Sequence, residues 1–258
     1  MVYLKTYQEI DLMRESSLLV SRTHAELAKI IKPGISSLYL DKIAEEFIRD
    51  NGGVPGFKGY NGFPSTLCIS KDQEVVHGIP SKKEIEEGSI LSIDCGVLMN
   101  DFYGDCAYTF AVGEISEDKQ RLLDVTKKAL SIGVSLATYG NTVGDIGFGI
   151  QQFAEAQGYS VVKELVGHGI GRSLHEEPEI PNYGQKGKGV LLDDGLVVAI
   201  EPMINMGLDG VFQKKDGWTI VTQDGLPSAH FEYTIAITKE KTEILSSFDL
   251  IEDVLINN

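Results

Sequence analysis

Charged residues inside apolar, strand-like runs constrain this chain more than any other feature of its sequence. Asp94 ends the run Ile90-Leu91-Ser92-Ile93, and Glu201 ends the run Val197-Val198-Ala199-Ile200. An ionised carboxylate in such a run loses its hydration at a high free-energy cost unless a cation neutralises it. The two runs therefore predict that cations lie beside these strands.

Three further residues extend this set to four carboxylates and one imidazole. Each of the five sits where a strand-like or glycine-rich segment would expose it to the same face of a sheet; they are Asp94, Asp105, His168, Glu201 and Glu232. Manganese, iron, cobalt and zinc all accept oxygen and nitrogen donors of this kind. A lone acid at a strand end is usually solvated, but the joint pattern predicts two divalent ions.

An internal repeat supports this interpretation. Glu87–Asp94 reappears as Asp194–Glu201, with an acid, a glycine, an apolar strand and a second acid in the same order. Upstream, Gly34–Gly52 matches Gly140–Gly158 in length and in the closing glycine. Two halves related by a pseudo-twofold axis, roughly residues 7–115 and 116–240, would make Asp94 equivalent to Glu201 and Asp105 to Glu232. His168 would then distinguish the two metal positions.

Hydrophobic periodicity and turn residues predict an α+β fold. Helices are expected at about 7–31, from a cap at Ser37 to Ile48, at 118–137 and at 142–157. Residues 90–99 and 102–112 flank Asn100-Asp101 and read as an antiparallel hairpin. We expect helices packed on one side of a curved, mainly antiparallel sheet, with the site on its other side. Residues 1–258 are expected to form one domain, because no linker or low-complexity tract divides them.

Charge and cysteine content exclude several kinds of partner. The net charge of −15 disfavours broad binding to nucleic acid or to anionic membranes. No segment is apolar enough for a signal peptide or a bilayer span, and three cysteines fit a reducing compartment, so a cytoplasmic protein is expected. Cys95 and Cys106 follow Asp94 and Asp105, and alternation along a strand predicts that their thiols face the core.

The remaining histidines and glycines have more ordinary interpretations. His24 lies on a polar helix face and is expected at the surface. His230 should share a strand face with Glu232, where a structural role is favoured over contact with the metal ligands. Gly167–Gly171 lacks the lysine of a phosphate-binding loop. Its glycines would let the backbone approach a bound peptide.

The ordered motifs together resemble the type I methionine aminopeptidases of the bacterial kind over nearly the whole chain. The resemblance rests on the five proposed ligands and their flanks, namely His77-Gly78-Ile79-Pro80, Gly167-His168-Gly169-Ile170-Gly171, His175-Glu176 and Ala199-Ile200-Glu201-Pro202-Met203. There is no room for the inserted subdomain of type II members, and no zinc-finger extension precedes the catalytic segment. The resemblance implies the pita-bread fold, which agrees with the internal repeat.

The same resemblance implies a mechanism and a substrate pocket. Asp105 and Glu232 would bridge two metal ions, Asp94 would bind one, and His168 and Glu201 the other. A water or hydroxide between the ions would attack the peptide bond, Glu201 would carry the proton, and His175 and His77 would contact the scissile carbonyl and amide nitrogen. The implied methionine pocket comprises Phe57, Tyr60, Phe63, Cys68, Leu174 and Trp218, although core packing is the ordinary explanation for such residues.

Three residues depart from the usual pattern of the family. Phe57 stands where other bacterial members have cysteine, Phe63 where many have tyrosine, and Tyr233 where histidine is usual. None belongs to the implied ligand set, so these differences bear on pocket shape and on tolerance of the second substrate residue.

The expected activity is removal of N-terminal methionine from nascent proteins and peptides when the second residue is small and uncharged. A peptidase of the prolidase or X-Pro aminopeptidase type and a non-catalytic peptide-binding relative are the alternatives. We expect a monomer that binds the N-terminal peptides of nascent chains, with no specific nucleic acid and no membrane as partners; transient contact with the ribosome is left open.

Overall fold

The computed structural model describes residues 1–257 and contains helices and antiparallel strands in the expected order. The helices are α1 (Tyr7–Ala28), α2 (Ser37–Asp50), α3 (Glu117–Leu136), α4 (Val143–Ala156) and α5 (Asp249–Asn257), with a short 3-10 helix at Tyr60–Gly62. The first half carries β1 (Val54–Pro55), β2 (Leu67–Lys71), β3 (Glu74–Val76), β4 (Ser89–Met99) and β5 (Phe102–Val112). The second carries β6 (Ser160–Val161), β7 (Gly167–Gly169), β8 (Glu176–Ile180), β9 (Leu196–Ile200), β10 (Met203–Asn205), β11 (Val211–Gln213), β12 (Ile220–Thr222), β13 (Ser228–His230), β14 (Tyr233–Ile237) and β15 (Thr242–Ile244).

Helices α2 and α4 reproduce the upstream part of the repeat. Each contains 14 residues and begins three residues after a glycine with a left-handed backbone, Gly34 (φ 85°) and Gly140 (φ 88°). The cap of α2 is Ser36, whose hydroxyl accepts a hydrogen bond from the Tyr39 N–H, so the prediction of a Ser37 cap was wrong. Ser37 is already helical, and its hydroxyl instead accepts a hydrogen bond from the Ser81 N–H at 2.9 Å.

The β4–β5 hairpin is confirmed. Met99 pairs with Phe102, and the two turn residues both have a left-handed backbone, with φ 54° at Asn100 and 63° at Asp101. A two-residue turn of this kind matches the twist of the strands it joins, and asparagine and aspartate tolerate it well. The tight turn therefore fixes the register that brings Asp94 and Asp105 together.

The strands form several antiparallel sheets rather than the single curved sheet expected. The largest has the order β15-β14-β9-β7-β8, and β4 is hydrogen-bonded to β1, β2 and β5. Between β5 and β14 the Glu232 N–H donates to the Ala107 carbonyl at 2.9 Å. This bond lies at the junction of the halves, where the two large sheets meet.

Two threonines hold that junction in a reciprocal way. The Thr234 hydroxyl accepts from the N–H of Asp105 and donates to its carbonyl, at 3.1 and 2.7 Å. The Thr109 hydroxyl makes the same two bonds to His230, at 3.0 and 2.7 Å. Asp105 is therefore the backbone equivalent of His230, and the predicted equivalence of Asp105 with Glu232 was wrong by two residues.

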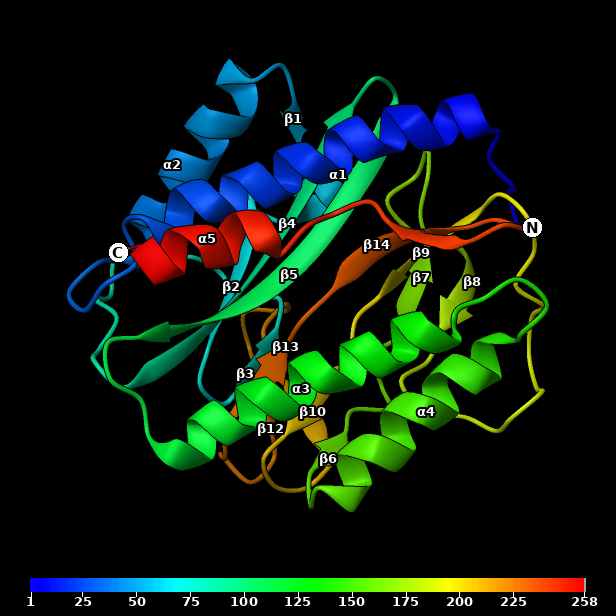
Figure 1. Ribbon diagram of the computed structural model, residues 1–258. Helices are drawn as coiled ribbons and strands as arrows, with labels where there is room; N and C mark the ends of the chain where they lie inside the picture. Colours follow the sequence, from blue (N-terminus) through cyan, green and yellow to red (C-terminus); the bar gives the residue numbers. More distant parts are fainter. Residues whose placement is uncertain (258) are drawn as a thin grey trace.

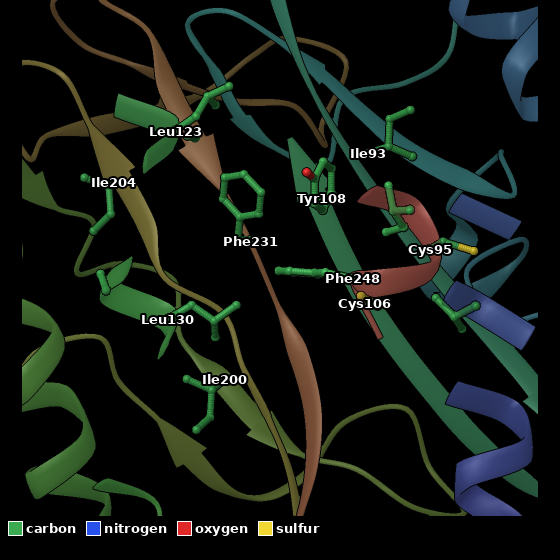
Figure 2. Close-up of a cluster of buried hydrophobic side chains, with 14 of the residues drawn as sticks. Ile93, Cys95, Cys106, Tyr108, Leu123, Leu130, Ile200, Ile204, Phe231 and Phe248 are labelled. Atoms are coloured by element: carbon green, nitrogen blue, oxygen red, sulfur yellow. The ribbon is translucent and has the colours of Figure 1, made fainter. Parts of the chain in front are cut away.

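A hydrophobic core lies between the helices and the strands. Helix α1 covers β4 and β5, and α2 and α5 pack against α1, whereas α3 and α4 cover strands of the second half (Figure 1). Figure 2 shows Ile93 and Cys106 of the first half in one cluster with Ile200 and Phe231 of the second. Alternation along β4 and β9 then turns the residues after Ile93 and Ile200, which are Asp94 and Glu201, to the opposite face.

The cysteines behave as predicted, but His24 does not. Cys95 and Cys106 are unexposed and belong to the main core cluster. His24 is also unexposed, because α1 turns this face onto β5, and its Nε2–H donates to the Cys106 carbonyl at 2.9 Å. Burial lowers the pKa of His24 to about 4, so the ring is neutral at physiological pH. Among residues 1–257, no helix has both the length and the apolar character to cross a bilayer.

Candidate metal centre and active site

The β4–β5 hairpin presents two carboxylates on one face. Asp94 pairs with Ala107 and Asp105 pairs with Gly96, so the two acids are diagonal neighbours. Burial and the neighbouring charges of Asp94 and Glu201 raise the pKa of Asp105 well above its usual value. Burial likewise raises the pKa of Asp94 to about 7. Placing such groups together is unfavourable unless protons or cations neutralise them.

The second half contributes Glu201 at the end of β9 and Glu232 just before β14. Burial and the charges of Asp105 and Glu201 raise the pKa of Glu232. Burial also acts to raise the pKa of Glu201, but the proximity of His230 and His168 outweighs it, and the pKa is lowered. Glu201 thus differs from the other three carboxylates of the site, whose pKa values are all raised.

His168 is oriented toward these carboxylates by its own backbone segment. Its Nδ1–H donates to the Gly169 carbonyl at 2.9 Å, which leaves Nε2 without a proton and free to bind a cation. Nε2 lies 3.6 Å from Glu201 Oε1 and 4.0 Å from Asp105 Oδ2. A fixed tautomer of this kind is typical of histidines that ligate metals.

The glycines on either side of His168 allow close packing against the neighbouring strands. A Cβ on Gly167 would lie 2.4 Å from the Ala199 carbonyl oxygen, and one on Gly169 would lie 2.3 Å from that of Glu177. The need for glycine at these two positions therefore comes from close strand packing, and the approach of a bound peptide to this backbone stays a prediction. They let β7 pack tightly between β8 and β9, which fixes the position of His168.

The donor set fits divalent cations. Asp105, His168 and Glu232 each offer one ligand atom within 4.8 Å of the others. Within residues 1–257, Asp94 Oδ1 and Glu232 Oε1 are buried without a hydrogen-bond partner. Unsatisfied buried carboxylate oxygens are rare in native proteins, and a bound cation accounts for them.

Two further histidines flank the carboxylates. The ring of His175 lies 4.3 Å from that of His168, edge to face, and its Nδ1 is hydrogen-bonded to the Tyr60 hydroxyl at 2.8 Å. Desolvation and the neighbouring His168 lower the pKa of His175 to about 4. Burial also lowers the pKa of His77, which has a left-handed backbone (φ 58°). Both imidazoles are therefore neutral at pH 7.

His77 owes its position to the glycine that follows it. A Cβ on Gly78 would lie 2.1 Å from the Ile69 carbonyl oxygen, and the Gly78 carbonyl accepts a hydrogen bond from the Ile69 N–H at 2.8 Å. Only glycine allows this close approach to β2. The segment after β3 is therefore fastened to β2 while His77 faces the cavity.

A single cavity of about 360 Å³ joins all the predicted site residues. Its lining includes every predicted ligand, both auxiliary histidines and the whole predicted pocket, namely Phe57, Tyr60, Phe63, Cys68, His77, Asp94, Asp105, His168, Leu174, His175, Glu201, Trp218 and Glu232. The edge of the Phe63 ring packs against Trp218, with centroids 5.1 Å apart. Cys68 pairs with Asp94 across the β2–β4 ladder, which places its thiol on the same face as the carboxylates.

The sequence did not reveal the other residues at this cavity. Asn61, Val76, Glu164, Leu165, Val166 and Met203 also line it. Asn61 lies in the short 3-10 helix, and the others lie in loops or short strands. Only Leu165 and Val166, just before Gly167, and Met203, two residues after Glu201, lie beside a motif that the sequence revealed. His230 lies beside the cavity, with Nε2 3.4 Å from Glu201 Oε2.

Comparison with known proteins agrees with this geometry. A sequence profile of metallopeptidase family M24 matches residues 11–239. Methionine aminopeptidase 1 of Bacillus subtilis is 48% identical over 246 residues, which cover 95% of this chain and 99% of that protein. Crystal structures of methionine aminopeptidase from Thermotoga maritima and Rickettsia prowazekii are 42% and 37% identical, each with a TM-score of 0.94 and with coverage of 96% of this chain and 100% of theirs.

Proposed function

The chain belongs to metallopeptidase family M24 and, within it, to the methionine aminopeptidases, with their pita-bread fold, and on that premise we propose that it removes N-terminal methionine from peptides and nascent proteins. The observation that carries the proposal is the convergence of four carboxylates and His168 on a cavity whose other walls are aromatic, aliphatic and thiol side chains. A peptide amino terminus in this cavity would lie beside the ligands, with an apolar side chain in the adjoining pocket.

Five residues would hold two divalent ions. Asp105 and Glu232 would be shared by both, Asp94 would complete one position, and His168 and Glu201 the other. When bound, the ions supply positive charge that lowers the pKa of a water molecule and stabilises the oxyanion formed at the scissile carbonyl. The choice among manganese, iron, cobalt and zinc rests on cellular availability, since all of them accept these donors.

Glu201 is proposed as the group that receives the proton of the attacking water. Its lowered pKa keeps the carboxylate ionised at neutral pH, and the two neighbouring histidines that lower it, His168 and His230, also orient it. A positioned carboxylate of this kind acts as a general base and then returns the proton to the departing amine.

His175 and His77 are proposed to bind the atoms of the scissile amide. If the Tyr60 hydroxyl donates to Nδ1 of His175, the neutral ring carries its proton on Nε2 and donates it toward the carbonyl oxygen. A preformed donor of this kind stabilises the negative charge that develops during attack. His77, also neutral, would hydrogen-bond the amide nitrogen as it leaves.

The pocket residues would select methionine. Phe57, Phe63, Cys68 and Leu174 are almost unexposed and form one apolar cluster, against which Trp218 packs. Soft and aromatic surfaces suit a thioether side chain. The limited cavity volume favours a small second residue in the substrate. We further propose that the two halves act as one catalytic domain in a monomer and that its substrates are nascent chains in the cytoplasm.

Release of free methionine from defined peptides tests the proposal. Metal-stripped protein should be inactive on Met-Ala-Ser and regain activity with Mn²⁺, Co²⁺, Fe²⁺ or Zn²⁺, whereas Met-Leu-Ser should be cleaved poorly under every condition. His168→Ala and Glu232→Ala should remain inactive with each metal, while Arg172→Met, which changes a surface loop, serves as the matched control. Turnover retained by either ligand variant would sink the assignment.

Two peptide outcomes would favour other functions. Preferential cleavage of a peptide with proline as second residue would indicate a prolidase-type specificity. Binding of Met-Ala-Ser without cleavage, in protein that has taken up metal, would indicate a peptide-binding relative.

A further inference from the structure

The segment that precedes α1 packs against the loop that carries His175. Val2 forms a β-bridge with Glu177, and the Lys5 N–H donates to the Gly195 carbonyl at 2.7 Å. Lys5 Nζ also donates to the Tyr3 carbonyl at 3.0 Å. The N-terminus consequently lies on the side of the molecule formed by β7, β8 and β9 (Figure 1).

Lys5 forms a buried ion pair with Glu176, the residue that follows His175. Lys5 Nζ and Glu176 Oε2 are 2.6 Å apart, with side-chain exposures of 5% and 7%. Among the lysine and arginine ion pairs of residues 1–257, this one is the most buried. Its charges are shielded from solvent, so its geometry is held more firmly than that of a surface pair.

The second oxygen of Glu176 fastens the loop on the other side of His175. Glu176 Oε1 accepts a hydrogen bond from the Ser173 N–H at 3.1 Å. A Cβ on Gly171 would lie 2.6 Å from both Glu176 Oε1 and Lys5 Cε, so the loop closes tightly over the ion pair. One carboxylate thereby joins the N-terminal segment to Ser173 and Glu176, and His175 lies between these two residues.

Other contacts also hold the loop, since Leu174 is 2% exposed in an apolar cluster and Nδ1 of His175 is hydrogen-bonded to the Tyr60 hydroxyl at 2.8 Å. Residues 171–175 form no helix or strand, and the hydrogen bond from the Tyr103 N–H to the Gly171 carbonyl, 2.8 Å long, lies at the start of the loop. Arg172 pairs with Glu9 at 3.3 Å, but its side chain is 61% exposed. Glu176 is the residue through which the loop is joined to the N-terminal segment, so its attachment contributes to the position of the His175 ring beside His168.

We propose that Lys5 is a positioning residue for catalysis, which acts through Glu176 to fix His175 over the scissile carbonyl. The inference rests on the proposed function for its catalytic consequence, but the fastening of the loop is independent of it. His175 would contact the oxyanion rather than bind the methionine side chain, so its displacement lowers kcat more than it raises KM.

The kinetic test compares Lys5→Met in two backgrounds with Met-Ala-Ser as substrate. In the otherwise unchanged enzyme, Lys5→Met should lower kcat roughly 10- to 100-fold with KM nearly constant, since small displacements of a catalytic group have effects of this size. In a His175→Ala background the same substitution should change kcat less than about twofold, because residues that act as a unit are not additive. Arg172→Met, on the same loop, should leave kcat unchanged.

An equal loss of kcat in both backgrounds would overturn the proposal, because Lys5 would then act independently of His175. If Lys5→Met fails to fold because Glu176 is left charged and alone, the variant Lys5→Met/Glu176→Gln removes both charges and keeps an acceptor for the Ser173 N–H. This pair variant should fold and still show the reduced kcat; full recovery of kcat would also overturn the proposal.

Amide hydrogen exchange gives a readout that does not depend on activity. The amides of residues 173–176 should exchange at least about tenfold faster in Lys5→Met, or in the pair variant if Lys5→Met does not fold, because the loop has lost its link to the N-terminal segment, while those of β4 and β5 should not change. Unchanged protection of the loop would contradict the attachment. Failure of the unchanged protein to release methionine would instead count against the proposed function, and the exchange result would still decide the attachment.

Discussion

The two halves of the molecule share a backbone frame but place different side chains on it. Helices α2 and α4 have the same length, and Thr109 and Thr234 hold the opposite half with the same pair of hydrogen bonds. At equivalent backbone positions, however, the first half carries Asp105 and the second half carries His230. The frame therefore explains why the ligands converge, and the side-chain differences explain why the site is asymmetric.

The connections between the paired strands also differ. In the first half, β4 and β5 are joined by the two-residue turn Asn100-Asp101. In the second half, β9 and β14 are separated by an excursion that contains β10–β13 and brings Met203 and Trp218 to the cavity. The repeated part supplies most of the carboxylates, whereas the unrepeated excursion contributes to the pocket. Substitutions at equivalent positions of the two halves test whether the halves have these different roles.

The largest difference in activity should appear when Asp105 and His230, which occupy equivalent backbone positions, are each replaced by asparagine. Asp105→Asn removes a carboxylate proposed to be shared by both metal ions and should lower kcat/KM for Met-Ala-Ser by more than about 1000-fold. His230→Asn removes only a partner of Glu201 and should cost about 10- to 100-fold, as changes behind a metal ligand usually do. Equal losses in the two variants, measured by methionine release, would contradict the asymmetry.

Metal removal should have the next largest effect, on stability. The substitution Glu232→Gln should make the stripped protein more stable. At pH 7.5, saturating Mn²⁺ at about 100 times its Kd should stabilise the unchanged protein by about 2.7 kcal/mol. Burial and repulsion raise the pKa of Glu232 in the folded, metal-free protein, so its ionisation there is unfavourable. Glu232→Gln should therefore raise the Tm of the stripped protein but reduce the rise in Tm that Mn²⁺ causes. A lower Tm of the stripped variant would argue against crowded carboxylates.

The threonine pair should separate stability from activity. Thr109→Val and Thr234→Val each remove two hydrogen bonds to the backbone of the other half, and each should lower the free energy of unfolding by about 1–3 kcal/mol. Because the Thr109 hydroxyl is also hydrogen-bonded to the Ser92 hydroxyl at 2.8 Å, urea denaturation should give a loss for Thr109→Val at least as large as that for Thr234→Val. Thr234→Val should reduce kcat/KM more, because Thr234 holds Asp105 whereas Thr109 holds His230. The reverse order of activity would contradict the assigned roles.

The smallest effect at neutral pH should come from His24→Leu. The sequence spacing between the first residues of α2 and α4, Ser37 and Val143, also relates His24 to Leu130. Both of these side chains are fully buried. The substitution removes one hydrogen bond to the Cys106 carbonyl, so the free energy of unfolding at pH 7 should change by no more than about 1 kcal/mol.

The same variant should alter the pH dependence of stability. The pKa of His24 is about 4 in the folded protein and about 6.5 when unfolded, so the unfolded chain binds the extra proton first. The stability contributed by the neutral ring is complete above pH 6.5 and falls as the pH drops toward 4, by about 3 kcal/mol in total. His24→Leu should remove this loss in urea titrations; an unchanged acid limb would show that His24 is not buried in its neutral form.

Much of the fold and the residues that share the cavity could be predicted from the sequence, the carboxylates and His168 from local patterns and the pocket residues from the family resemblance. Apolar runs ending in acids identified β4 and β9, and Asn100-Asp101 identified the hairpin turn. The equivalence of Asp105 with His230 could not be deduced, since it depends on hydrogen bonds between strands far apart in the chain. The burial of His24 likewise depends on which face of α1 packs against β5. The polar residues around His24 gave no indication that this face is buried.

The loops around the site were the least predictable part. The role of Gly167 and Gly169 in close strand packing depends on tertiary contacts with Ala199 and Glu177, although glycine itself was conspicuous in the sequence. The contact between Lys5 and Glu176 joins two positions without any sequence pattern that links them. Site residues carried by motifs were therefore predictable, whereas the residues that hold those motifs in place were not.

The most direct test of the account is a count of metal ions per chain. Metal-stripped protein would be equilibrated with Mn²⁺, freed of excess ions by dialysis at fixed free Mn²⁺, and assayed for metal and protein content, with His24→Leu as control and Glu232→Ala as the ligand variant. The account predicts two ions per chain in the unchanged protein and the control, and fewer than two in Glu232→Ala. One ion or none in the unchanged protein at saturation, or no difference in Glu232→Ala, would contradict it.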